Sequence, residues 1–133
     1  SDILEIMDKS FYINTFMKML NKLLVDKGYS TISVGIGVST AQELVVKAGR
    51  KDVGINNSVW IGNAVTKASN LSSLGNKKDY KSILISESVY KNIKDSYNKD
   101  WFTLRNNSEI GKFYDCDIIK TNFNNWINNG MKE

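Results

Sequence analysis

The chain has 133 residues, of which 41% are hydrophobic and 24% are charged, and this composition suits one globular domain. Its formal net charge is +4, but the lysines are scattered instead of gathered in a stripe, so we expect no nucleic-acid partner. The absence of histidine and the single cysteine, Cys116, exclude an imidazole metal site, a Cys–His or Ser–His–Asp catalytic group and an internal disulfide.

The first 28 residues have the pattern of one long amphipathic helix that ends at Gly28. Strands often precede such a helix in natural domains. We therefore interpret residues 1–133 as the C-terminal part of a longer domain whose N-terminal strands are missing from this chain. The apolar positions at helical spacing are Ile3, Ile6, Met7, Ile13, Phe16, Met17, Leu20, Leu23 and Leu24.

Three strands are predicted next, in TISVGIGVST, AQELVVKAG and SVWI. The first two are expected to pair antiparallel if their link is short. Gly35 and Gly37 in the first of them allow a close backbone approach or a bulge. Trp60, in the third, is interpreted either as a core residue or as a platform for a nucleobase.

A second amphipathic helix is predicted over residues 63–74, ending at Gly75. It places Asn63, Thr66 and Asn70 on one face, which by default is a solvated face. Gly62, just before it, permits either tight strand–helix packing or the approach of a phosphate to the helix start. Both interpretations of this junction remain open from the residues alone.

The last third of the chain predicts an apolar central strand in SILIS, a helix capped by Ser86, and a terminal hairpin of WFTLR with KFYDCDIIK. Asp115 and Asp117 are expected on the solvent face of that hairpin, and NNWINNG is expected to be a frayed, polar end. The order α-β-β-β-α-β-α-β-β predicts an α+β fold in which helices cover one face of a mostly antiparallel sheet.

Three motifs in this order, GIGV, IGNAVTKASNL and ILISESVY, resemble the later half of the catalytic domain of class III adenylate and guanylate cyclases. In that family a G-I-G/N strand is followed by a hairpin, by the pattern D-x-x-G-x-x-V-N-x-A-x-R-L, and by an apolar strand with S-E-x-x-Y. The matching segment covers residues 32–93. The order and spacing of the three motifs together carry the resemblance.

The resemblance implies a ferredoxin-like fold that dimerises head to tail and binds a nucleoside triphosphate at the dimer interface. It also implies two divalent ions, Mg or Mn, which activate the ribose 3′ hydroxyl and neutralise the triphosphate. The two carboxylates that hold these ions belong to the region before the first helix. We therefore expect the metal ligands outside this chain and none within it.

Carried over residue by residue, the family's helix Asn falls on Thr66 and its transition-state Arg falls on Asn70. These two are the candidate catalytic residues, although Asn70 lacks the charge that stabilises a phosphoryl transition state. The adenine-reading Asp falls on Val59, and a lysine before the last strand matches Lys112 loosely. The candidate substrate-binding residues are Val59, Trp60, Gly62, Asn63, Lys67 and Lys112.

Val59 in place of an adenine-reading Asp favours another base, and a pyrimidine could lie against Trp60. Bacterial pyrimidine cyclases are divergent members of this family that make cyclic UMP or cyclic CMP as an anti-phage signal. We therefore predict, for the full-length protein, a nucleotidyl cyclase that converts a nucleoside triphosphate to a 3′,5′-cyclic nucleotide and pyrophosphate. The alternative, favoured by Asn70, is a catalytically degenerate cyclase-like module for dimerisation or regulation.

The sequence shows no signal peptide and no run of 18 apolar residues. From this we expect a cytoplasmic protein without a membrane partner, and the resemblance implies that it is a homodimer.

Overall fold

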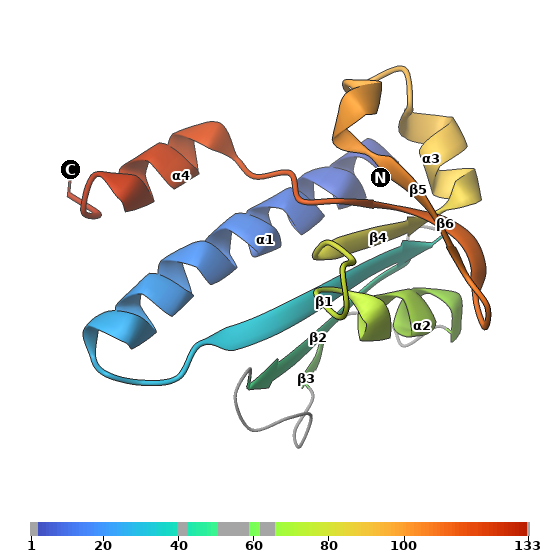
Figure 1. Ribbon diagram of the computed structural model, residues 1–133. Helices are drawn as coiled ribbons and strands as arrows, with labels where there is room; N and C mark the ends of the chain where they lie inside the picture. Colours follow the sequence, from blue (N-terminus) through green and yellow to red (C-terminus); the bar gives the residue numbers. More distant parts are fainter. Residues whose placement is uncertain (1–2, 40–42, 51–58, 62–65, 133) are drawn as a thin grey trace.

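The computed structural model describes residues 3–39, 43–50, 59–61 and 66–132, and it shows an α+β fold as predicted (Figure 1). The chain order of its elements follows the predicted order and adds a short 3₁₀ helix and a C-terminal helix. The elements are α1 (Ile3–Asp26), β1 (Ile32–Ser39), β2 (Glu43–Arg50), β3 (Val59–Ile61), α2 (Thr66–Leu74), β4 (Ile83–Ser86), α3 (Glu87–Ile93), η1 (Lys99–Trp101), β5 (Thr103–Asn107), β6 (Gly111–Cys116) and α4 (Thr121–Asn128).

The described strands form one mixed sheet in the order β3-β2-β1-β4-β6-β5. β1 pairs with β2 antiparallel, as expected, and with β4 parallel, whereas the other pairings are antiparallel. The apolar strand β4 lies between β1 and β6 and is buried along its whole length. Its predicted central position is therefore confirmed.

Helices cover both faces of this sheet, so the prediction that they cover one face is wrong. Figure 1 shows α1 along one side of the strands and α2 on the other. Side chains alternate along each strand, so neighbouring residues of β1 and β4 serve different faces. Val34, Ile36 and Ile85 belong to the core cluster beneath α1 and α3, whereas Leu84 joins Leu71 of α2 in a second cluster.

Helix α1 follows from its apolar spacing and ends where the sequence predicts. Met7 and Phe11 are buried against the sheet. After the last turn, Gly28 adopts a φ of +78°, and the Tyr29 amide donates to the Leu24 carbonyl at 2.8 Å. A left-handed glycine with this backward hydrogen bond is a common helix stop. No helix in the described residues combines the length and apolarity needed to span a membrane.

Two features near the end of the chain can be compared with the predictions. Ser86 caps α3, since its hydroxyl accepts a hydrogen bond from the Val89 amide at 3.3 Å, as predicted. The tail, expected to be frayed, instead forms α4, which lies beside α1 (Figure 1). Ile127 of α4 is buried, and its carbonyl accepts a hydrogen bond from Lys22 Nζ at 3.1 Å, so α1 anchors this helix.

Candidate functional site at helix α2

Two glycines of β1 allow α2 to lie directly on the sheet. A Cβ atom built on Gly37 would lie 2.1 Å from the Ala68 carbonyl oxygen, and one on Gly35 would lie 2.0 Å from the Ser72 carbonyl oxygen. No side chain fits at these distances, so the backbones of β1 and α2 are in contact. The predicted close approach is confirmed, and it fixes which side of α2 is turned away from the core.

The outer side of α2 carries two of the predicted site residues. Ala68 and Leu71 are fully buried against the sheet, while Lys67 and Asn70 are exposed. Thr66 begins the helix, but its side chain lies outside the described part. Lys67 and Asn70 are therefore available to a partner or a ligand and are not part of the protomer's own core.

Strand β3 brings two further predicted residues beside β2. In the antiparallel pairing of these strands, Val59 lies opposite Ala48 and Trp60 lies opposite Lys47. The side chains of Val59 and Trp60 are outside the described part, as are residues 62–65 with the predicted Gly62 and Asn63. The pairing still shows that the β3 segment lies in register with the middle of β2.

Lys47 is a residue at this site that the sequence analysis missed. It is half-buried on β2, and its Nζ donates a hydrogen bond to the Ser73 hydroxyl of α2. Partial burial and the nearby Lys77 ammonium both lower the pKa of Lys47 below its usual value. The available signal was a lysine in the middle of the largely apolar strand ELVVKAG.

Lys112 lies elsewhere in the structure. On β6, Phe113 packs with Leu71 of α2, whereas Tyr114 and Cys116 belong to the cluster on the α1–α3 face. Strand alternation places the exposed Lys112 with the latter two, on the face opposite α2. The structure thus places Lys67 and Asn70 on the outer side of α2 and pairs the β3 backbone with β2, and it puts Lys112 on the opposite face of the sheet from α2.

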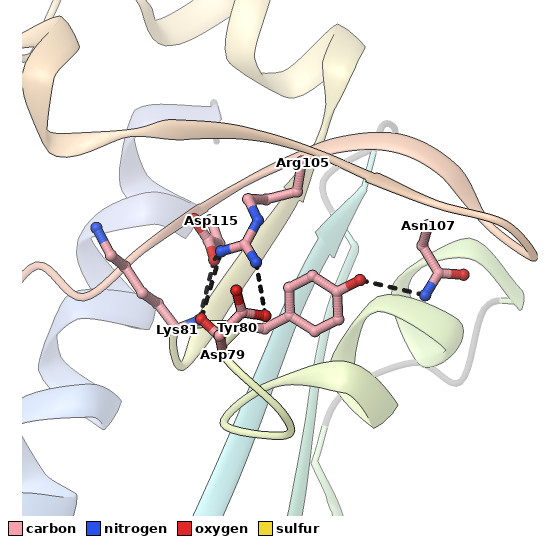
Figure 2. Close-up of polar contacts among 6 residues, drawn as sticks. All are labelled: Asp79, Tyr80, Lys81, Arg105, Asn107 and Asp115. Atoms are coloured by element: carbon pink, nitrogen blue, oxygen red, sulfur yellow. Dashed lines mark hydrogen bonds and ion pairs between the residues drawn. The ribbon is translucent and has the colours of Figure 1, made fainter.

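Asp115 does not lie on a solvent face, which corrects the expectation for this residue. Its side chain is fully buried, and its Oδ2 accepts hydrogen bonds from Arg105 Nη1 at 2.9 Å and from the Lys81 amide at 3.0 Å (Figure 2). Arg105 also pairs with Asp79 at 2.8 Å and lies 4.6 Å from the centre of the Tyr80 ring. This Arg105 cluster links β5, β6 and the turn before β4, and its role is structural.

Asp117 is exposed, as expected, and it is held by neighbouring polar groups. Its Oδ1 accepts hydrogen bonds from Asn14 Nδ2 at 2.9 Å and from Ser82 Oγ at 3.0 Å. In the described part of the chain, no three His, Cys, Asp or Glu side chains gather closely enough to hold a metal ion. The residues described here therefore do not fit a metal site, and no chemical step is assigned to one.

Cys116 is a buried thiol, as predicted from the alternation of β6. Burial is the main cause that raises its pKa to about 12. The thiol therefore stays protonated at neutral pH, which excludes it as a nucleophile in the folded protein.

Comparison with known proteins supports the resemblance. A protein named uridylate cyclase from Treponema porcinum is 55% identical over 132 residues, which are 98% of this chain and 46% of that protein. The chain is a homologue of uridylate cyclases. A second protein of that name, from Gulbenkiania mobilis, is 30% identical over 138 residues, covering 95% of this chain and 53% of that protein. The predicted likeness to a pyrimidine cyclase is therefore confirmed.

The chain spans about half the length of these uridylate cyclases. No protein-family model and no solved structure matches it. The α+β class is thus confirmed by the structure, while the ferredoxin-like class III cyclase fold stays a prediction.

Proposed function

We propose that the full-length protein is a uridylate cyclase, which converts UTP to 3′,5′-cyclic UMP and pyrophosphate. The observation that carries this proposal is the 55% identity, over nearly the whole chain, to a protein named uridylate cyclase. Val59 at the position of an adenine-reading Asp supports a pyrimidine base. In bacteria such a product serves as an anti-phage signal, and we extend the proposal to that role.

In the proposed reaction the ribose 3′ oxygen attacks the α-phosphorus of UTP and forms the cyclic phosphodiester bond. The bond from the α-phosphorus to the bridging oxygen of the β-phosphate breaks, pyrophosphate leaves, and the 3′ hydroxyl proton passes to solvent. Negative charge accumulates on the phosphate oxygens during this displacement, so hydrogen-bond donors and cations directed at them stabilise the transition state. Thr66 and Asn70 are the proposed donors from α2.

The proposed site is composite and needs a second subunit of the same chain in a class III cyclase arrangement. The exposed polar side of α2 supports this, since Lys67 and Asn70 are not buried within the protomer. Mg²⁺ or Mn²⁺ would be held by carboxylates outside the present sequence, because the described residues offer no such ligand group. Each subunit then supplies its α2 helix to a nucleotide bound mainly by the other.

Incubation of the full-length protein with each of the four nucleoside triphosphates and Mn²⁺, followed by mass spectrometry of the products, tests the proposal. We expect cyclic UMP from UTP and much less cyclic product from ATP or GTP. Cyclic AMP as the main product would refute the pyrimidine assignment. The absence of any cyclic product, with UTP binding that is absent or independent of metal, would instead support the degenerate module that Asn70 favours.

A further inference from the structure

An apolar groove of about 310 Å³ lies between α1 and the β1–β2 part of the sheet, on the face opposite α2. Among its lining residues are Ile13, Phe16 and Met17 of α1, Val34 of β1, and Val46 and Ala48 of β2. Val34 and Ala48 lie directly opposite each other in the antiparallel pairing of the two strands, so they form one continuous floor. We call this feature the α1–β2 groove.

The side of α1 that borders the groove carries large apolar side chains that stay exposed. Tyr12 and Phe16, which both line the groove, are 50% and 44% exposed, whereas Phe11 on the sheet-facing side is 4% exposed. Residues four apart share a helix face, so Tyr12 and Phe16 form one row and Ile13 and Met17 a second row beside it. Contiguous exposed apolar side chains of this kind mark an interaction surface.

The lining restricts the chemistry of what can fill the groove. None of the described residues that line it is charged. A phosphate group or a charged peptide would therefore lose its hydration without gaining an ionic partner. Apolar side chains of a protein segment gain by the same burial, because removing apolar surface from water is favourable.

The length of the related proteins indicates where such a segment comes from. Residues 1–133 match 46% and 53% of the two uridylate cyclases, so about half of each relative has no counterpart in this chain. A segment of the same polypeptide is held near the groove at a high effective concentration, which favours it over a separate partner.

The groove is also within reach of chain that enters α1 from its N-terminal end. The helix begins at Ile3, and Tyr12 lies about 14 Å further along its axis. About four or five extended residues span that distance. A segment just before Ser1 can therefore return along α1 to the groove.

We infer that the segment of the full-length protein that precedes Ser1 packs apolar side chains into the α1–β2 groove. The groove is then the surface at which residues 1–133 join the rest of the polypeptide, and Phe16 is buried in the full-length protein. The inference goes beyond the proposed function, since it requires neither a nucleotide nor catalysis.

Photo-crosslinking of the full-length protein tests the inference. The photoreactive residue p-benzoylphenylalanine replaces Phe16 in one variant and Tyr12 in a second, and circular dichroism verifies that each is folded. After irradiation, mass spectrometry identifies the joined peptides and gel electrophoresis shows the mass of the product. We expect a cross-link to a peptide from before Ser1, at the mass of one protomer. Leu104, 52% exposed on the edge strand β5, is the matched control and should give no cross-link to that segment.

Three outcomes of this experiment would overturn the inference. They are a cross-link to a second copy of the chain, at twice the protomer mass, cross-links only within residues 1–133, and no cross-link from either variant. Cyclic UMP formed by an original protein whose variants give one of these outcomes would leave the proposed function intact.

Urea denaturation of two serine variants of the full-length protein gives an independent measurement. Phe16 lines the groove, whereas Leu23, 38% exposed on the same helix, is not among the described lining residues. We expect Phe16→Ser to lower the midpoint clearly more than Leu23→Ser, because truncation of a buried aromatic side chain leaves a cavity. Equally small shifts in the two variants would show that Phe16 stays exposed and would overturn the inference.

Discussion

At the β5–β6 end of the sheet Arg105 lies between two carboxylates, whereas near the β2–β3 end Lys47 lies beside another lysine. In the first region the cation has anionic partners and an aromatic ring inside the same chain (Figure 2). In the second region, Lys67 and Asn70 are exposed on the outer side of α2. Breaking the buried ion pair of the first region should lower stability, whereas exposed polar side chains on a helix can be changed with little effect on the fold.

The strongest test of this contrast is the removal of Arg105. Arg105→Met leaves the fully buried Asp115 carboxylate without its cation, and breaking a buried pair in this way costs about 3–5 kcal/mol. We expect urea denaturation to show a loss of stability in that range. Adding Asp115→Asn to the same protein should recover part of the loss.

The control for that experiment is Lys120→Met, which removes one partner of the more exposed Lys120–Asp8 pair. Exposed pairs contribute less than about 1 kcal/mol. A loss as small for Arg105→Met as for Lys120→Met would contradict the structural role of the Arg105 cluster.

The next effect in size concerns the contact on which α2 depends. Gly37→Ala places a Cβ 2.1 Å from the Ala68 carbonyl oxygen, so α2 must move away from β1. We expect a cost of about 2–3 kcal/mol, as for other overpacking changes, measured by thermal unfolding. Because the proposed site depends on the position of α2, UTP binding by the full-length protein should weaken as well.

Ser33→Ala, in the same strand, removes an atom instead of adding one and is the matched control for Gly37→Ala. It should change stability far less. Unaltered stability in Gly37→Ala would show that α2 is not held against β1 as described.

The smallest effect on stability is expected at the proposed site itself. Asn70 is exposed on α2, and Asn→Ala in a helix stabilises by about 0.5 kcal/mol through helix propensity. Cyclase activity of the full-length Asn70→Ala variant should nevertheless fall. A slight gain in stability together with a loss of activity in Asn70→Ala would distinguish this region from the Arg105 cluster, where substitution is expected to lower the stability of the fold. Unchanged formation of cyclic product would remove Asn70 from the site.

Local signals in the sequence predicted most elements correctly. The helical period of residues 3–26, Gly28 after it, the cap at Ser86 and the alternation of β6 are all properties of short segments. The sequence analysis did not predict helices on both faces of the sheet. Gly35 and Gly37, which face α2, have no side chain and so add neither a hydrophobic nor a polar position to the strand pattern. Their absence of side chains is what allows a helix onto that face.

The errors at polar residues have a different cause, since they depend on partners distant in sequence. Asp115 looked like a solvent-facing residue because its partner Arg105 lies on the neighbouring strand. Lys47 was overlooked because Ser73 lies on a helix 26 residues later. The polar side of α2 was predicted from its spacing, and its exposure at Lys67 and Asn70 agrees with that. Burial of charge is thus decided by tertiary pairing that no local pattern contains.

The buried, protonated thiol of Cys116 gives a practical route to observing the proposed dimer. Maleimide reagents require a thiolate, so the native chain should stay unmodified near neutral pH without any background substitution. A cysteine introduced at an exposed site such as Lys91 would then be the one thiol of these 133 residues to accept a fluorophore or spin label. Distances between labels on two protomers could be followed while nucleotide is added.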